Sequence, residues 1–152
     1  MDIRLKFAAQ GSITFYGGFG DEQTNIWRLM ARQPTAWFTD MLDGVLEDAS
    51  RIHALVPDEE SRNMSRILTK FYKTFIVDSE PSEWRWIKTT ANSGDLPPRR
   101  EVPSVQPGGD FMDVGAIPGG IIVALDDDTC LYVYGWNCNV ALRSERKLVT
   151  LH

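Results

Sequence analysis

The apolar residues of this chain change their spacing along the sequence, and the order of the patterns limits the folds it can adopt. In the middle of the chain they recur at intervals of three and four, which is the period of a helix. Near both ends they alternate with polar residues or form short apolar runs, as in strands. Because strands and helices are grouped, we expect an α+β fold, with about three helices packed on one face of an antiparallel sheet.

Three helices are expected in the middle of the chain. The first begins near Asp21 and the third near Asp58, and both residues suit the start of a helix. The second extends from Thr35 to Pro57 and has the clearest apolar face, formed by Trp37, Phe38, Met41, Leu42, Val45, Leu46, Ala49 and Ile52. His53 would lie near the C-terminal end of this helix, where a histidine commonly has a structural role.

Strands are expected on both sides of the helices. They cover residues 3–7, 13–16, 84–90, 121–125, 130–136, 140–142 and 148–151. The acidic residues at positions 126–128 mark the turn of a hairpin that joins residues 121–125 to residues 130–136. A calcium loop is the less favoured interpretation of this turn, because the spaced oxygen ligands and the distal glutamate are missing.

A chain of 152 residues has the length of one typical domain, and we expect a single domain over residues 1–152. Residues 91–120 are rich in proline and glycine, which predicts a long loop of a kind that is often functional. No apolar run approaches the ~20 residues that a membrane span needs. The N-terminus also lacks the apolar run of a signal peptide, so we expect a cytoplasmic protein.

The net charge of −5 argues against a general nucleic-acid binder, which needs a basic surface. This charge is uneven, because residues 36–60 hold seven acidic residues and one basic residue, whereas residues 61–100 hold four and eight. Four of the acidic residues fall on the outer side of the expected second helix: Asp40, Asp43, Glu47 and Asp48. Such a face is ordinarily a solvated surface, and the alternative is a docking surface for a basic partner.

No pattern in the sequence predicts catalysis, a cofactor or a metal site. The turn Gly17–Gly20 precedes a helix, as phosphate-binding loops do, but no lysine with serine or threonine follows it. Asp110 and Asp113 flank Phe111 in the long loop and would form a carboxylate pair with no basic or histidine partner in register. A small hydrolase or nucleotide-binding enzyme that uses these residues is therefore only an alternative hypothesis.

One stretch of the sequence supports a comparison with a known family. Trp27-Arg28-Leu29-Met30, then Pro34 and Trp37-Phe38, follow an expected strand and the turn Tyr16-Gly17-Gly18. Over about the first 45 residues this aromatic spacing resembles small cytoplasmic immunity proteins that neutralise polymorphic toxins, particularly type VI-delivered nucleases of restriction-endonuclease-like fold. The resemblance implies a non-enzymatic inhibitor that binds one cognate toxin.

We therefore expect a protein that neutralises a secreted toxin by occluding its active site or blocking its assembly. A nuclease toxin would present a basic surface, and the four acidic residues of the second helix would complement it. The long loop would add a plug formed by Asp110, Phe111 and Asp113. We expect no nucleic-acid or membrane partner, and the alternative is a phage or mobile-element inhibitor of a host defence complex.

Overall fold

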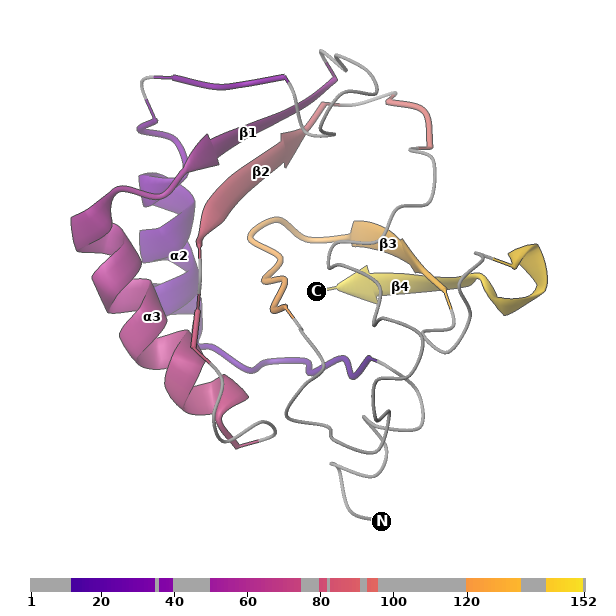
Figure 1. Cartoon of the computed structure of the whole chain (residues 1–152), viewed down its shortest axis with the longest axis horizontal. Helices are drawn as coiled ribbons and strands as arrows, with labels where there is room; N and C mark the ends of the chain where they lie inside the picture. Colours follow the sequence, from indigo (N-terminus) through magenta and orange to yellow (C-terminus); the bar gives the residue numbers. More distant parts are fainter. Residues whose placement is uncertain are drawn as a thin grey trace, which may run out of the picture. The chain divides into compact units, whose positions relative to one another are not determined.

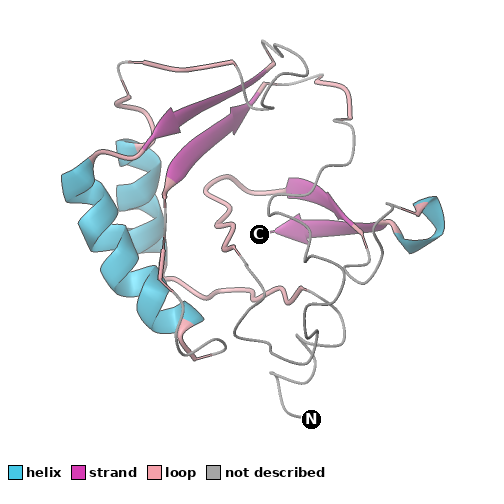
Figure 2. Cartoon of the chain, in the orientation of Figure 1, coloured by secondary structure: helices cyan, strands magenta, loops and turns pink. Residues whose placement is uncertain are grey.

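The computed structural model of the chain describes residues 12–34, 36–39, 50–74, 80–81, 83–90, 93–95, 120–134 and 142–151 (Figure 1). In these residues the fold is α+β, as expected, and it contains two antiparallel two-stranded sheets (Figure 2). The elements are α2 (Asp21–Met30), β1 (Arg51–Leu55), α3 (Asp58–Tyr72), β2 (Arg85–Thr89), β3 (Thr129–Val133), the 3-10 helix η2 (Arg143–Glu145) and β4 (Lys147–Leu151).

The described residues form two compact units, and the division between them falls inside α2. The first unit holds the described residues before 26 and after 98, including β3 and β4. The second holds those of 26–97, including β1, α3 and β2. Every buried residue of the described chain belongs to the second unit. Its apolar core consists of Trp27, Ala54, Val56, Met64, Leu68 and Trp86.

Helix α3 begins at Asp58, as the sequence predicts. Pro57 precedes it with φ −56°, and three acidic residues occupy its first turn, where they complement the positive end of the helix dipole. Met64 and Leu68, one turn apart, direct one stripe of the helix into the core. The helix ends at Tyr72, and the N–H of the next residue donates to the carbonyl of Thr69 at 2.8 Å.

Strands β1 and β2 pair antiparallel, with His53 opposite Ile87, Ala54 opposite Trp86 and Leu55 opposite Arg85. Successive residues of a strand point to opposite faces of the sheet. Ala54 and Trp86 are buried, with exposed fractions of 1% and 5%, so they mark the inner face of the sheet. Residues one position away in either strand belong to the outer face.

The prediction of a second helix from Thr35 to Pro57 is wrong near both ends of this range. Its last residues form β1, and Phe38 near its start makes an isolated antiparallel bridge to His53. Residues 40–49, its middle, lie outside the described residues. Helical periodicity is a local pattern and does not report pairing with a distant strand. β1 pairs with β2, which places Ala54 opposite Trp86, and this tertiary pairing outweighs the local pattern. The described residues thus contain two α-helices, where about three were expected.

The first unit is built on the pairing of β3 with β4, in which Thr129 lies opposite Leu151 and Val133 opposite Lys147. Before β3 the chain turns at Asp128, which has a φ of 59°, and Thr129 Oγ1 donates to the Asp126 carbonyl at 2.7 Å. The guanidinium of Arg146 lies 4.3 Å from the centre of the Tyr132 ring, a favourable cation–π contact across the hairpin.

Two expected strands of this unit do not form. Residues 13–16 and 121–125 are in neither a helix nor a strand, although the expected turn at 126–128 is present. β3 pairs with β4, so the predicted pairing of this strand with residues 121–125 is wrong. The described residues hold two small sheets, where one was expected. The expected strand at 3–7 and the first two residues of the one at 140–142 lie outside the described residues, and Leu142 is in neither a helix nor a strand. Within the described ranges, no helix has the length and apolar character to cross a bilayer.

Candidate functional site

The residues that the sequence suggests for partner binding all lie outside the described residues: Asp40, Asp43, Glu47, Asp48, Asp110, Phe111 and Asp113. Their roles stay predictions. The structure does show a different surface, on the outer face of the β1–β2 sheet, that the sequence did not suggest. We call the five residues that form it the outer sheet face: Phe38, His53, Leu55, Arg85 and Ile87.

The outer sheet face combines exposed apolar side chains with a buried polar centre. Phe38, His53 and Ile87 form one row across the sheet, because Phe38 and Ile87 each lie directly opposite His53 on its two sides. The exposed fractions of Phe38, Leu55 and Ile87 are 48%, 53% and 59%. Single exposed apolar residues are ordinary, but several on one sheet face form a surface that a protein partner can cover.

His53 lies at the centre of this face and is only 6% exposed. Its ring centre is 5.9 Å from that of Phe38, and its Nδ1 atom is 2.9 Å from Nη1 of Arg85. A guanidinium has only donors, so the Nδ1 atom accepts this hydrogen bond. His53 is therefore a structural residue, as the sequence suggested, but it lies on a strand and not on a helix.

Two hydrogen bonds fix the guanidinium of Arg85 at one end of the outer sheet face. Its Nη1 donates to His53, and its Nε donates to the Glu83 carboxylate. This hydrogen bond lowers the pKa of Glu83 below its ordinary value, and the positive charge of Arg85 acts in the same direction. The guanidinium is therefore fixed beside the apolar side chains, at the edge of the surface.

Replacing Glu83 with glutamine is expected to lower the free energy of unfolding near neutral pH, by no more than the ~1 kcal/mol of exposed ion pairs. The folded protein depresses this pKa, so the stabilisation is complete above the unfolded carboxyl value of about 4.3 and is lost as the pH falls through the folded value. Urea unfolding of both proteins measures the effect. A stability difference that does not shrink between about pH 7 and about pH 3 would contradict the ion pair.

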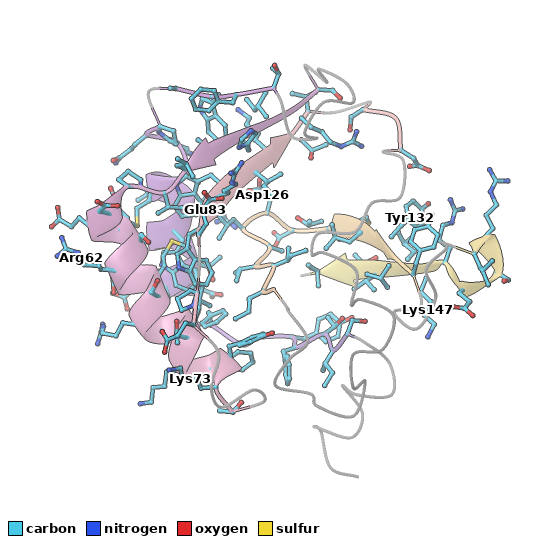
Figure 3. The ribbon with its side chains drawn as sticks, in the orientation of Figure 1. Arg62, Lys73, Glu83, Asp126, Tyr132 and Lys147 are labelled. Atoms are coloured by element: carbon cyan, nitrogen blue, oxygen red, sulfur yellow. The ribbon has the colours of Figure 1, made fainter. Side chains whose placement is uncertain are left out.

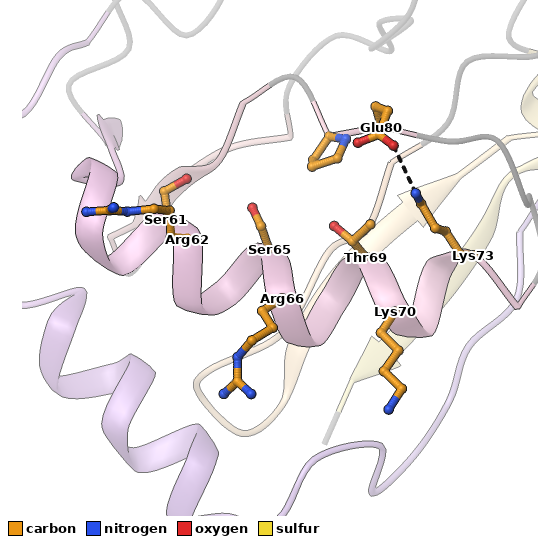
Figure 4. A pocket seen from close by; sticks show the side chains of 9 residues that line it. Ser61, Arg62, Ser65, Arg66, Thr69, Lys70, Lys73 and Glu80 are labelled. Atoms are coloured by element: carbon orange, nitrogen blue, oxygen red, sulfur yellow. Dashed lines mark hydrogen bonds and ion pairs between the residues drawn. The ribbon is translucent and has the colours of Figure 1, made fainter.

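A second surface feature is a shallow groove of about 580 Å³ beside α3. Figure 4 shows the hydroxyl-bearing side chains of Ser61, Ser65 and Thr69 on the side of α3 that faces Glu80. Basic residues also line the groove, and Figure 3 shows two of them, Arg62 and Lys73, extending outward from the helix.

The polar groups of this groove are partly engaged within the fold. Lys73 Nζ contacts Glu80 Oε1 at 2.9 Å, and Ser65 Oγ accepts a hydrogen bond from the indole N–H of Trp84. Groups that already have partners offer less to a ligand. In the ranges that the structure describes, no three histidine, cysteine or acidic side chains gather to hold a metal ion.

The geometry of the outer sheet face is the main observation that bears on function. No family model, curated protein or solved structure matches this chain. The function therefore has to be argued from the side chains themselves. The sequence carries a signal for this face, because Ile52, Ala54 and Val56 alternate with His53 and Leu55, but this signal overlaps the longer helical pattern that begins at Trp37.

Proposed function

We propose that this protein is a binding protein that neutralises a cognate toxin in the cytoplasm, and that the outer sheet face is part of its docking surface. The observation that supports this proposal is the group of half-exposed apolar side chains of Phe38, Leu55 and Ile87 on one sheet face. Fully burying an exposed side chain of this size is worth about 1.5–3 kcal/mol, so covering the exposed half is worth roughly half of that. Aromatic and aliphatic anchors of this kind commonly dominate the affinity of protein interfaces.

A set of acidic residues follows Phe38 in the sequence. Asp40 comes two positions after Phe38 and opens the acidic set that continues with Asp43, Glu47 and Asp48. Exposed apolar side chains with acidic residues close to them in the sequence suit a partner whose own apolar patch is surrounded by lysine and arginine. In this proposal the apolar side chains of Phe38, Leu55 and Ile87 supply most of the affinity, and the acidic residues speed association.

The test is neutralisation of the toxin encoded by the adjacent reading frame, expressed in a laboratory bacterial host. Co-expression of the original chain should restore growth, and the purified proteins should form a complex. A Leu55→Glu variant should lose neutralisation and bind at least ~100-fold more weakly, because it places a charge among the apolar side chains of the outer sheet face. The double variant Asp43→Lys, Glu47→Lys should mainly slow association and remove its dependence on salt.

Matched variants separate this surface from the rest of the molecule. Leu148→Glu alters a residue of β4 that is 57% exposed, close to the 53% of Leu55, and should neutralise normally. Circular dichroism checks that each variant is folded. Full neutralisation by a folded Leu55→Glu variant would exclude the outer sheet face as the docking surface. If the original chain does not neutralise any neighbouring gene product, the toxin hypothesis itself is wrong.

A further inference from the structure

Strand β2 has one edge paired with β1 and one edge that the described residues leave uncovered. The N–H of Val56 donates to the carbonyl of Trp84 at 3.1 Å, and the N–H of Thr90 donates to the carbonyl of Ser50 at 2.8 Å. In an antiparallel pair, hydrogen-bonded residues alternate with residues whose peptide groups point away. Trp86 and Lys88 therefore direct their peptide groups toward β1.

The peptide groups of Ile87 and Thr89 consequently point to the opposite edge. The opposite residue in β1 confirms this alternation, because the N–H and the carbonyl of His53 both bond to Phe38, each at 2.9 Å. No described strand pairs with β2 on its second edge. Arg85, Ile87 and Thr89, the residues of β2 whose peptide groups point to this edge, are all exposed. An uncovered strand edge is a template for another strand.

The sequence of β2 is compatible with its own copy in antiparallel register. If Ile87 lies opposite Ile87 of a second copy, then Arg85 lies opposite Thr89 and Trp86 opposite Lys88. No charged residue then faces a like charge directly, which would be destabilising in a sheet. Ile87 would form a hydrogen-bonded pair with its own copy, because its peptide groups point toward this edge.

We propose that the protein forms a symmetric dimer in which β2 pairs with β2 of a second copy of this chain. The two sheets join into one sheet of four strands in the order β1-β2-β2-β1. The row of Phe38, His53 and Ile87 then continues through Ile87 of the second copy into its own His53 and Phe38, so that the apolar outer face becomes continuous across the dimer. Such an isologous contact is the commonest route to a homodimer.

The self-paired position of Ile87 allows a charge-swap test by analytical ultracentrifugation, from micromolar to near-millimolar protein. The original chain should show a monomer–dimer equilibrium. The variants Ile87→Glu and Ile87→Lys should each raise the dimer Kd by at least ~10-fold, because each places like charges opposite one another. An equal mixture of the two variants should dimerise again, because glutamate then faces lysine.

Leu55→Glu is the matched control, because Leu55 is on the same face and 53% exposed but lies one strand away from the proposed axis. It should dimerise within about 3-fold of the original chain. A monomeric original chain, an unchanged dimer in Ile87→Glu, or an equal loss of dimer in Leu55→Glu would each overturn the proposal. The last result would point to packing of two outer faces. None of these readouts involves a toxin, so the dimer and the proposed function can fail separately.

Discussion

Replacing Trp27 with alanine is expected to lower the free energy of unfolding by about 3–5 kcal/mol, more than most single substitutions. Trp27 and Leu68 are the largest side chains without exposed surface in the described part of the chain, and Trp27 is the only residue of α2 that is buried. Its loss would leave a cavity that the surrounding side chains fill only partly. Domains are stable by about 5–15 kcal/mol, so the variant should unfold at a much lower urea concentration. Circular dichroism during a urea titration measures the change.

Leu29→Ala provides the control on the same helix. Leu29 is 59% exposed, and leucine and alanine both favour helices, so the loss should stay within about 0.5 kcal/mol. Comparable losses from Trp27→Ala and Leu29→Ala would show that α2 does not bury the side of the helix on which Trp27 lies.

Replacing Ala54 with glutamate is expected to have a similarly large effect by a different mechanism. Ala54 is 1% exposed and lies opposite Trp86 on the inner face of the sheet. A carboxylate without a buried partner costs about 3–5 kcal/mol there, and the longer side chain also overfills the space. The variant should unfold at a much lower urea concentration near neutral pH. Acid should reduce the loss in free energy of unfolding, because the carboxyl then becomes neutral.

The neighbouring residue supplies a sharp comparison. Leu55→Glu introduces the same side chain one position later, on the outer face, and should change the free energy of unfolding by less than about 1 kcal/mol. This contrast tests the register of β1 directly, because a shift by one residue would exchange the two faces. Greater damage from Leu55→Glu than from Ala54→Glu would mean that the faces are assigned the wrong way round.

The helices show what local sequence is able to specify. The starts of α2 at Asp21 and of α3 at Asp58 were predicted from acidic first turns and apolar spacing, and both are confirmed. These signals act within a few residues of chain, so neighbouring residues alone determine them. The strand at Arg85–Thr89 was also predicted, because its short alternating pattern competes with no helical one.

The strand partners show what local sequence leaves open. β1 was assigned to a helix because Ile52 continues an apolar period that begins at Trp37, whereas its actual pairing with β2 crosses all of α3. β3 was given the nearest apolar run as its partner and instead pairs with β4. Pairing depends on backbone groups that meet only in the folded chain, and no periodicity of the sequence reports it.

The same limit applies to the candidate site. Phe38 and Ile87 were placed in separate elements by the sequence, and only the bridge and the strand register bring them to either side of His53. Charge patterning predicted a docking surface from neighbouring residues, which is as far as local information reaches. A surface assembled from three segments needs the fold before it can be recognised.

The division of the chain into a continuous unit and a discontinuous one has a consequence for synthesis on the ribosome. Among the described residues, all the buried ones, from Trp27 to Trp86, belong to one uninterrupted stretch, so their partners emerge together and can pack while translation continues. The other unit joins the two ends of the chain, and the hydroxyl of Tyr16 bonds to the carbonyl of Thr150 at 3.4 Å. The early residues of this unit can therefore complete their contacts only after residue 150 has been synthesised.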